Sequence, residues 1–115
     1  MKEIIYGQVV SKTNNYQVGD SAGKKHIIKS KELKLYEWSF VKQCWIYKDK
    51  LISKPFKLIV DVFESSNRYD LDNALKTILD CLQYAKAITN DSLCHGIQAT
   101  KKIDNRRQLV EFEIV

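Results

Sequence analysis

Acidic side chains gather in one part of this otherwise basic chain. Asp70 and Asp72 stand at the expected start of a helix, and Asp91 precedes a later strand. Successive helical residues rotate by about 100°, so Asp70 and Asp72 can converge only if Asp70 lies before the helix in extended backbone. Asp91 could then join them from its loop. Carboxylates so close would raise one another's pKa, unless a divalent cation held them ionised.

The residue types indicate which metal such a site would hold. Oxygen ligands without nearby Cys or His favour Mg²⁺, with Mn²⁺ as a substitute. A metal of this kind activates water and neutralises charge in phosphodiester hydrolysis. Lys76 lies one helical turn after Asp72 and could bring its ammonium group to the scissile phosphate or the attacking water.

The same residues also have interpretations that involve no metal. Aspartate is favoured at helix starts because it caps backbone N–H groups and interacts well with the helix dipole. Lys76 is spaced to pair with Asp72 or Asp80 on one helix face. Periodicity alone does not separate these alternatives.

Composition limits the architecture and the partners. A chain of 115 residues suits one domain, 1–115, and a net charge of +5 favours polyanionic partners such as nucleic acid. No apolar run approaches the roughly 20 residues of a membrane helix, and no signal peptide is visible, so we expect a cytoplasmic protein near nucleoid DNA and no membrane partner. Cys44, Cys81 and Cys94 lack paired spacing and are expected to be reduced packing residues.

Hydrophobic periodicity predicts the elements that position the acids. Strands are expected at 2–10, 26–28, 56–63, 93–103 and 109–115, with a loop through Gly19 to Gly23. One helix begins after the cap Ser30 and a second after Asp70. Strand 56–63 reads as a central strand buried on both faces, and the last two strands as an antiparallel hairpin. The order β-β-α-β-α-β-β predicts an α/β fold, a mixed sheet packed by two main helices. Trp38 and Trp45 are expected in the core or in a dimer contact.

The motif around the acids resembles the RusA family of Holliday junction resolvases. The resemblance rests on Arg68-Tyr69-Asp70-Leu71-Asp72-Asn73, followed by Lys76, Asp80, Leu82 and Asn90-Asp91, and on Ser11-Lys12-Thr13-Asn14-Asn15-Tyr16 near the amino end. It covers most of the chain.

The resemblance implies a homodimeric, Mg²⁺-dependent endonuclease. Such an enzyme makes paired symmetric cuts in four-way DNA junctions during recombination and repair, and leaves 5′-phosphate ends. Asp70, Asp72 and Asp91 would be metal ligands, and Lys76 a catalytic lysine. Two alternatives stay open: a less specific metal-dependent nuclease, or a non-catalytic nucleic-acid-binding domain in which the acids only cap the helix.

Polar and basic residues in or beside the expected loops are candidates for DNA contacts. They are Lys12, Asn14, Asn15, Tyr16, Arg68, Lys101, Lys102, Arg106 and Arg107. For the lysine pair a solvated surface is an equal alternative, and for the Asn-Asn-Tyr segment ordinary turn chemistry is.

Overall fold

The computed structural model describes residues 1–11, 16–21 and 24–115 of the chain. The elements follow in the order β1 (Glu3–Tyr6), β2 (Tyr16–Ser21), β3 (Lys24–Lys29), α1 (Lys31–Gln43), β4 (Phe56–Glu64), α2 (Leu71–Tyr84), the 3₁₀ helix η2 (Asp91–Leu93), β5 (Cys94–Ile103) and β6 (Leu109–Ile114). The α/β class, the mixed sheet and the two main helices are as predicted. Strand β2 is additional: it occupies part of the expected loop because it pairs antiparallel with β3.

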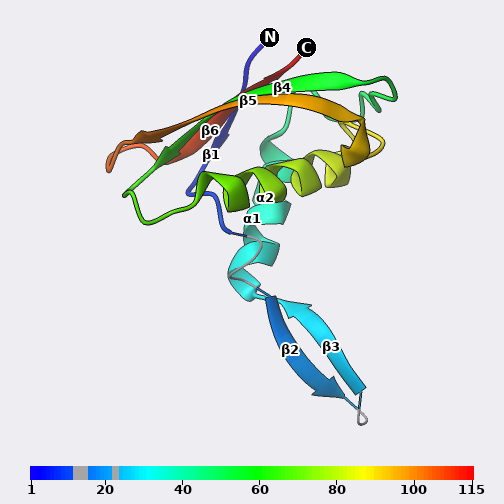
Figure 1. The fold of residues 1–115 in the computed structure, drawn as a ribbon, viewed down its shortest axis with the longest axis vertical. Coiled ribbons are helices and arrows are strands. Elements are labelled where there is room, and N and C mark those ends of the chain that lie inside the picture. Colours follow the sequence, from blue (N-terminus) through cyan, green and yellow to red (C-terminus); the bar gives the residue numbers. More distant parts are fainter. Residues whose placement is uncertain (12–15, 22–23) are drawn as a thin grey trace.

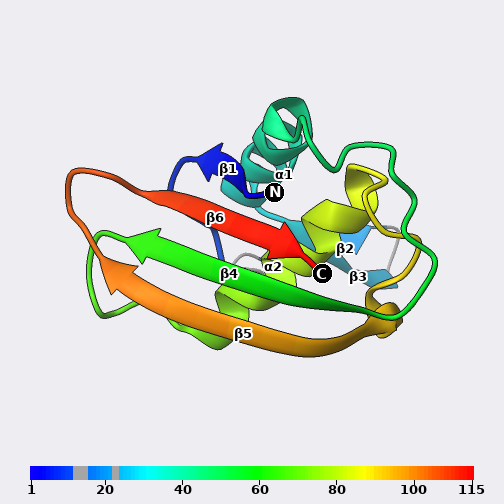
Figure 2. The ribbon, with the colours of Figure 1, turned by 90° about the horizontal axis from the view of Figure 1, so that it is seen from above.

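Strand β4 lies inside a four-stranded sheet of order β1-β6-β4-β5. It runs parallel to β5 and antiparallel to β6, as Figure 2 shows from above. The central position of β4 is confirmed, but the prediction of a β5–β6 hairpin was wrong. Residues 104–108 carry the chain past the end of β4, so that β6 pairs with β4 on one side and with β1 on the other. Two strand spacings are only about 10 Å, which a linker of this length can cross.

Both main helices lie on the same face of this sheet (Figure 1). Along β4, Leu58, Val60 and Val62 are therefore buried, whereas Lys57 on the opposite face is exposed and Asp61 is half-buried. The prediction that this strand is buried on both faces was wrong. The apolar run reflects one face packed on helices and one mixed face.

Helix α1 begins where its cap predicts. Ser30 is the N-cap, and its Oγ accepts a hydrogen bond from the Leu33 amide at 3.1 Å. Tyr36 and Phe40 turn into the core, whereas Trp38 is 63% exposed. Trp45, seven residues later and beyond the end of α1, is 87% exposed, so neither tryptophan is a core residue.

Strands β2 and β3 form a hairpin apart from the four-stranded sheet. The β2–β3 hairpin projects away from the sheet beyond α1 (Figure 1).

The three cysteines, Cys44, Cys81 and Cys94, are all free thiols, as predicted, and the first two are buried. No helix in the described part of the chain is long and apolar enough to cross a membrane.

Candidate active site

Asp70 and Asp72 occupy the start of α2 as the sequence predicted. Asp70 is the N-cap, with extended backbone (φ −83°, ψ 124°), and Asp72 lies in the first turn. Both side chains are exposed. The Asp70 carboxylate makes no capping hydrogen bond to the backbone; it accepts one at 3.4 Å from the Asn73 side-chain amide. Asp70 thus holds the cap position while leaving most of its acceptor capacity open.

The segment between β4 and α2 is held in place by two neighbouring elements. The Lys101 ammonium, on the helix-facing side of β5, donates to the carbonyls of Tyr69 at 2.9 Å and Asn67 at 3.3 Å. From the chain after β1, the Gln8 side-chain oxygen accepts from the Ser65 amide at 3.2 Å. These contacts determine where Asp70 begins the helix.

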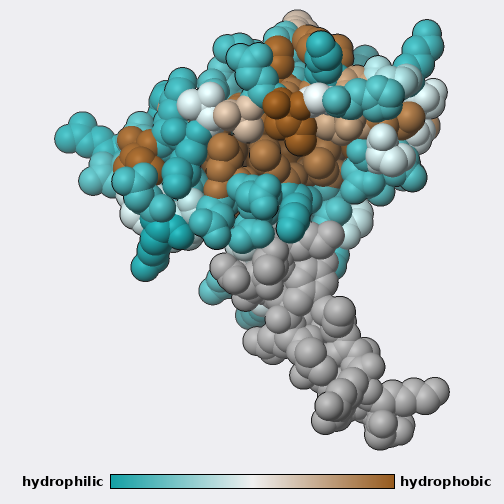
Figure 3. Space-filling model, in the orientation of Figure 1, coloured by the Kyte–Doolittle hydropathy of each residue, from teal (hydrophilic) through white to brown (hydrophobic). Residues whose placement is uncertain are grey.

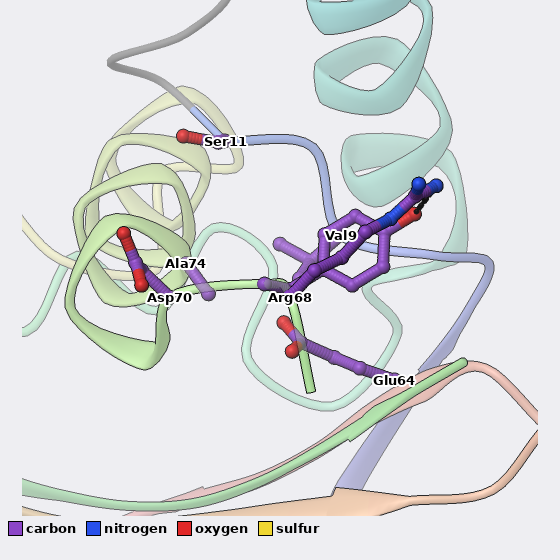
Figure 4. Close-up of a pocket in the computed structure, with 7 residues that line it drawn as sticks. Val9, Ser11, Glu64, Arg68, Asp70 and Ala74 are labelled. Atoms are coloured by element: carbon purple, nitrogen blue, oxygen red, sulfur yellow. Dashed lines mark hydrogen bonds between the residues drawn. The ribbon is translucent and has the colours of Figure 1, made fainter. Parts of the chain in front are cut away.

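A small cavity of about 50 Å³ opens beside this helix start (Figure 4). It is lined by Val9, Ser11, Glu64, Arg68, Tyr69, Asp70 and Ala74. Figure 4 shows Glu64 entering from the end of β4, with its carboxylate directed toward the start of α2. A strand end, a helix start and the segment after β1 therefore meet around one cavity.

Glu64 is a site residue that sequence reasoning missed. Its side chain is 0% exposed, and burial raises the pKa of its carboxyl group. The positive charge of Lys101 acts in the opposite direction on this pKa, and the charge of Asp70 raises it further. The available signal was the alternation along β4: Glu64 continues the buried series of Leu58, Val60 and Val62.

Arg68 and Tyr69 form a pair at the mouth of the cavity. The Arg68 guanidinium donates to the Tyr69 hydroxyl at 3.2 Å and lies 5.2 Å from the centre of its ring. This hydrogen bond lowers the pKa of the Tyr69 phenol. Arg68 is exposed and remains available to a polyanion.

Lys76 is exposed on α2, one turn beyond Asp72. Within the described residues, no ion pair joins Lys76 to Asp72. The Asp72–Lys76 ion pair that the spacing allowed is therefore not formed.

Asp91 lies at the opposite end of the sheet from Asp70. Strands β4 and β5 are parallel, so Cys94 at the start of β5 pairs with Phe56 at the start of β4. Asp91 comes just before Cys94 and belongs to that end, whereas Asp70 follows Glu64 at the other end.

Helix α2 spans the separation between the two acids. Its 14 residues are about 20 Å long, and the Asp91 amide donates to the Gln83 side chain in the last turn at 2.9 Å. Asp72 is in the first turn. Among the described residues, no group of three or more Asp, Glu, His or Cys side chains is arranged to hold a metal. The expectation that Asp91 joins Asp70 and Asp72 within one chain is thus not met, because a β-α-β crossover places the two loops at opposite ends.

The basic candidates divide between the two faces of the sheet. Lys101 faces the helices, as described above, and is half-buried. Lys102 faces the other way: it pairs with Asp61 at 3.5 Å and lies 5.3 Å from the Phe63 ring centre. The structure therefore does not place Lys102 beside Asp70.

The β5–β6 turn lies at the Asp70 end. The Asp104 amide donates to the Glu64 carbonyl at 2.9 Å, which fixes the turn beside the end of β4. Arg106 and Arg107 are exposed in this turn; Arg107 pairs with Asp104 at 3.7 Å. Both arginines thus lie at the end of the sheet where α2 begins. Arg107 turns to the face away from the helices, because its guanidinium lies 4.9 Å from the Phe63 ring centre.

The candidate DNA contacts near the amino end lie mostly outside the described residues. Lys12, Asn14 and Asn15 lie outside the described residues, and only the backbone of Tyr16 is described, in β2. Ser11, directly before them, lines the cavity.

Exposed basic side chains lie near the acids at the start of α2, and clustered positive charge of this kind favours binding of nucleic acid. The model of the family described as endodeoxyribonuclease RusA matches residues 7–114. The chain therefore belongs to the RusA endodeoxyribonuclease family, and by family it is a nuclease. A comparison with curated proteins gives no match.

Proposed function

We propose that this protein is a Mg²⁺-dependent endonuclease that resolves four-way DNA junctions by paired symmetric cuts. It would act in recombination and repair, on nucleoid DNA in the cytoplasm, and leave 5′-phosphate ends. The observation that carries the proposal is the Asp70 carboxylate, which occupies the cap of α2 without capping it and borders a cavity. The carboxylate of a residue present only to cap the helix would accept a hydrogen bond from a backbone amide of the first turn.

The donor set around α2 fits the metal that the family implies. Asp70 and Asp72 supply carboxylate oxygens, which hard cations such as Mg²⁺ prefer and Mn²⁺ also accepts. When bound, the ion supplies a more acidic water and neutralises charge on the phosphate. Lys76 extends from the next turn of the same helix flank and would hold its ammonium beside the phosphate as negative charge develops there.

Asp91 would complete the metal site of a second copy of the chain. It lies about one helix length from Asp72 in its own chain, so it can meet Asp72 only across a subunit contact. A two-fold axis perpendicular to α2 would make the α2 helices of the two chains run in opposite directions. The Asp91 end of one chain then lies at the Asp72 end of the other, and each site is completed by the partner.

The two flanks of α2 indicate which surface makes this contact. On one flank, the Thr77 hydroxyl donates to the Val10 carbonyl at 2.7 Å, and the Tyr84 hydroxyl accepts from Lys29 at 2.8 Å. This flank therefore packs against the rest of its own chain. A rotation of about 100° per residue puts Leu79 on the other flank.

That second flank is apolar and lies beside an open sheet edge. Leu75 and Leu79 are only half-buried there. Strand β5 is an edge strand of the described sheet, and its helix-facing Ile97 and Ile103 are 43% and 48% exposed. Figure 3 shows a hydrophobic band on the side where Figure 1 has α2 and β5 in front. An apolar band along an open strand edge suits a second copy of the same surface, with the two β5 strands antiparallel.

DNA would approach the end of the sheet where α2 begins. Arg68, Arg106 and Arg107 supply exposed positive charge there. Phosphate contacts of this kind determine position rather than sequence. Lys12, Asn14, Asn15 and Tyr16 would contact the DNA from the segment that follows Ser11, which lines the cavity.

A cleavage assay tests the proposal against its two alternatives. The protein is incubated with a synthetic four-way junction and with linear duplex of the same sequence, each with Mg²⁺ or with EDTA. Paired nicks in the junction that require Mg²⁺ are the expected result. Equal cutting of duplex and junction would favour a less specific nuclease. Tight junction binding without any cutting would favour a binding domain.

A further inference from the structure

Two buried carboxylates in the described residues differ sharply in their surroundings. Glu3 is 4% exposed, and its Oε1 accepts from the backbone amides of Trp45 at 2.8 Å, Ile46 at 2.6 Å and Tyr47 at 3.3 Å. These hydrogen bonds hold the segment after α1 against β1. This is the arrangement expected of a buried acid with a structural role.

Glu64 has none of these partners. Its side chain is 0% exposed, and neither carboxylate oxygen has a hydrogen-bond partner among the described residues. The nearby Lys101 ammonium donates instead to the carbonyls of Tyr69 and Asn67. A buried acid without hydrogen bonds is costly, and such a group in a native structure calls for a missing partner.

The position of Glu64 indicates what that partner is. Its carboxylate enters the cavity that Asp70 also lines (Figure 4). Two carboxylates around one cavity repel each other, and the charge of Asp70 adds to the rise in the pKa of the Glu64 carboxyl group that burial causes. A cation between the two would offset that repulsion. A cavity of about 50 Å³ has room for an ion or for a few water molecules, since one water needs roughly 10–15 Å³.

We propose that Glu64 is a ligand of the bound divalent cation, which it and Asp70 hold between the end of β4 and the start of α2. This inference rests on the proposed metal-dependent function and adds a ligand from the sheet to those on the helix. Mg²⁺ commonly takes one or two protein carboxylates and completes its shell with water and phosphate, so Glu64 and Asp70 suffice to seat it. Asp72 and the Asp91 of a second chain would add carboxylates near the same site.

The test measures metal binding in the absence of DNA. Thermal unfolding of the wild-type protein is followed with EDTA and with increasing MgCl₂, and the same series is run on Glu64→Gln, Asp70→Asn and Glu3→Gln. Binding to the folded state alone raises the melting temperature with concentration. Wild type should show this rise; Glu64→Gln and Asp70→Asn should lose most of it.

Glu3→Gln is the matched control, because it also neutralises a buried glutamate. It should unfold at a lower temperature without metal, since Glu3 accepts three backbone hydrogen bonds, yet keep the full rise with MgCl₂. Glu64→Gln loses no hydrogen bond and should unfold, without metal, at or above the wild-type temperature.

Two results would overturn the assignment of Glu64: an undiminished rise in Glu64→Gln, or no rise in the wild-type protein at millimolar MgCl₂. Neither depends on junction cleavage. A wild-type enzyme that cuts junctions while Glu64→Gln still binds Mg²⁺ would refute only the role of Glu64. A protein that binds Mg²⁺ through Glu64 but cuts no DNA would refute only the junction-resolving function.

Discussion

Mixed dimers provide the sharpest test of a site shared between subunits. We expect the inactive variants Asp72→Asn and Asp91→Asn to restore cleavage when their subunits are combined. In a mixed dimer, one site contains both substitutions, and the other draws wild-type Asp72 from one chain and wild-type Asp91 from the other. If each chain instead built its whole site, both sites of the mixed dimer would be inactive.

The size of the recovered signal follows from the proposed two-fold dimer. Random exchange between equal amounts of two homodimers yields about half mixed dimers, each with one intact site. About a quarter of the sites should therefore work in the mixture, and about half in isolated mixed dimers. These dimers cut one strand of a junction and should leave nicked molecules in place of fully resolved duplexes. The position of Asp91, beside the last turn of α2 while Asp72 lies in the first, is the structural basis of this expectation.

The assay uses co-expressed variants with two different affinity tags, so that mixed dimers can be isolated before incubation with a labelled four-way junction and Mg²⁺. A mixed dimer of Asp70→Asn and Asp72→Asn is the control. Both substitutions affect the same half of the site, so this dimer should stay inactive. Absence of nicking by the isolated Asp72/Asp91 dimer, with wild-type tagged dimers active, would refute the shared site.

Three further results are expected. Lys76→Ala should lower junction cleavage by roughly 100-fold or more at saturating DNA, as for loss of one charge-stabilising group, with little change in melting temperature; equal rates would leave Lys76 a surface residue. Leu79→Glu should shift the protein from dimer to monomer in light scattering, whereas Trp38→Glu, which alters an exposed residue on α1, should remain dimeric; the opposite pattern would move the contact to α1. Glu3→Ala should reduce the free energy of unfolding by about 2–4 kcal/mol in urea titration, because buried amides lose their acceptor, and a loss below about 0.5 kcal/mol would contradict that role.

Local sequence patterns determined the elements that carry the acids. The apolar spacing after Asp70 predicted α2, and the stereochemistry of a helix start placed Asp70 in extended backbone and Asp72 in the first turn, as observed. The apolar run ending at Phe63 likewise predicted the central strand, although only one of its faces is packed on helices. These features depend on neighbours within a few residues of each other, which is why the sequence alone reveals them.

Tertiary structure alone decided how these elements meet. Strand β6 pairs with β4 rather than with β5, and this choice depends on contacts between distant segments that no local pattern encodes. The parallel β4–β5 pair sends Asp91 to the far end of α2, although the sequence places it soon after the other acids. The same packing buries Glu64 beside Asp70, with no hydrogen-bond partner in the part of the chain that the structure describes. Which acids share a site is thus a property of strand order and direction, whereas which acids begin the helix is a property of the sequence itself.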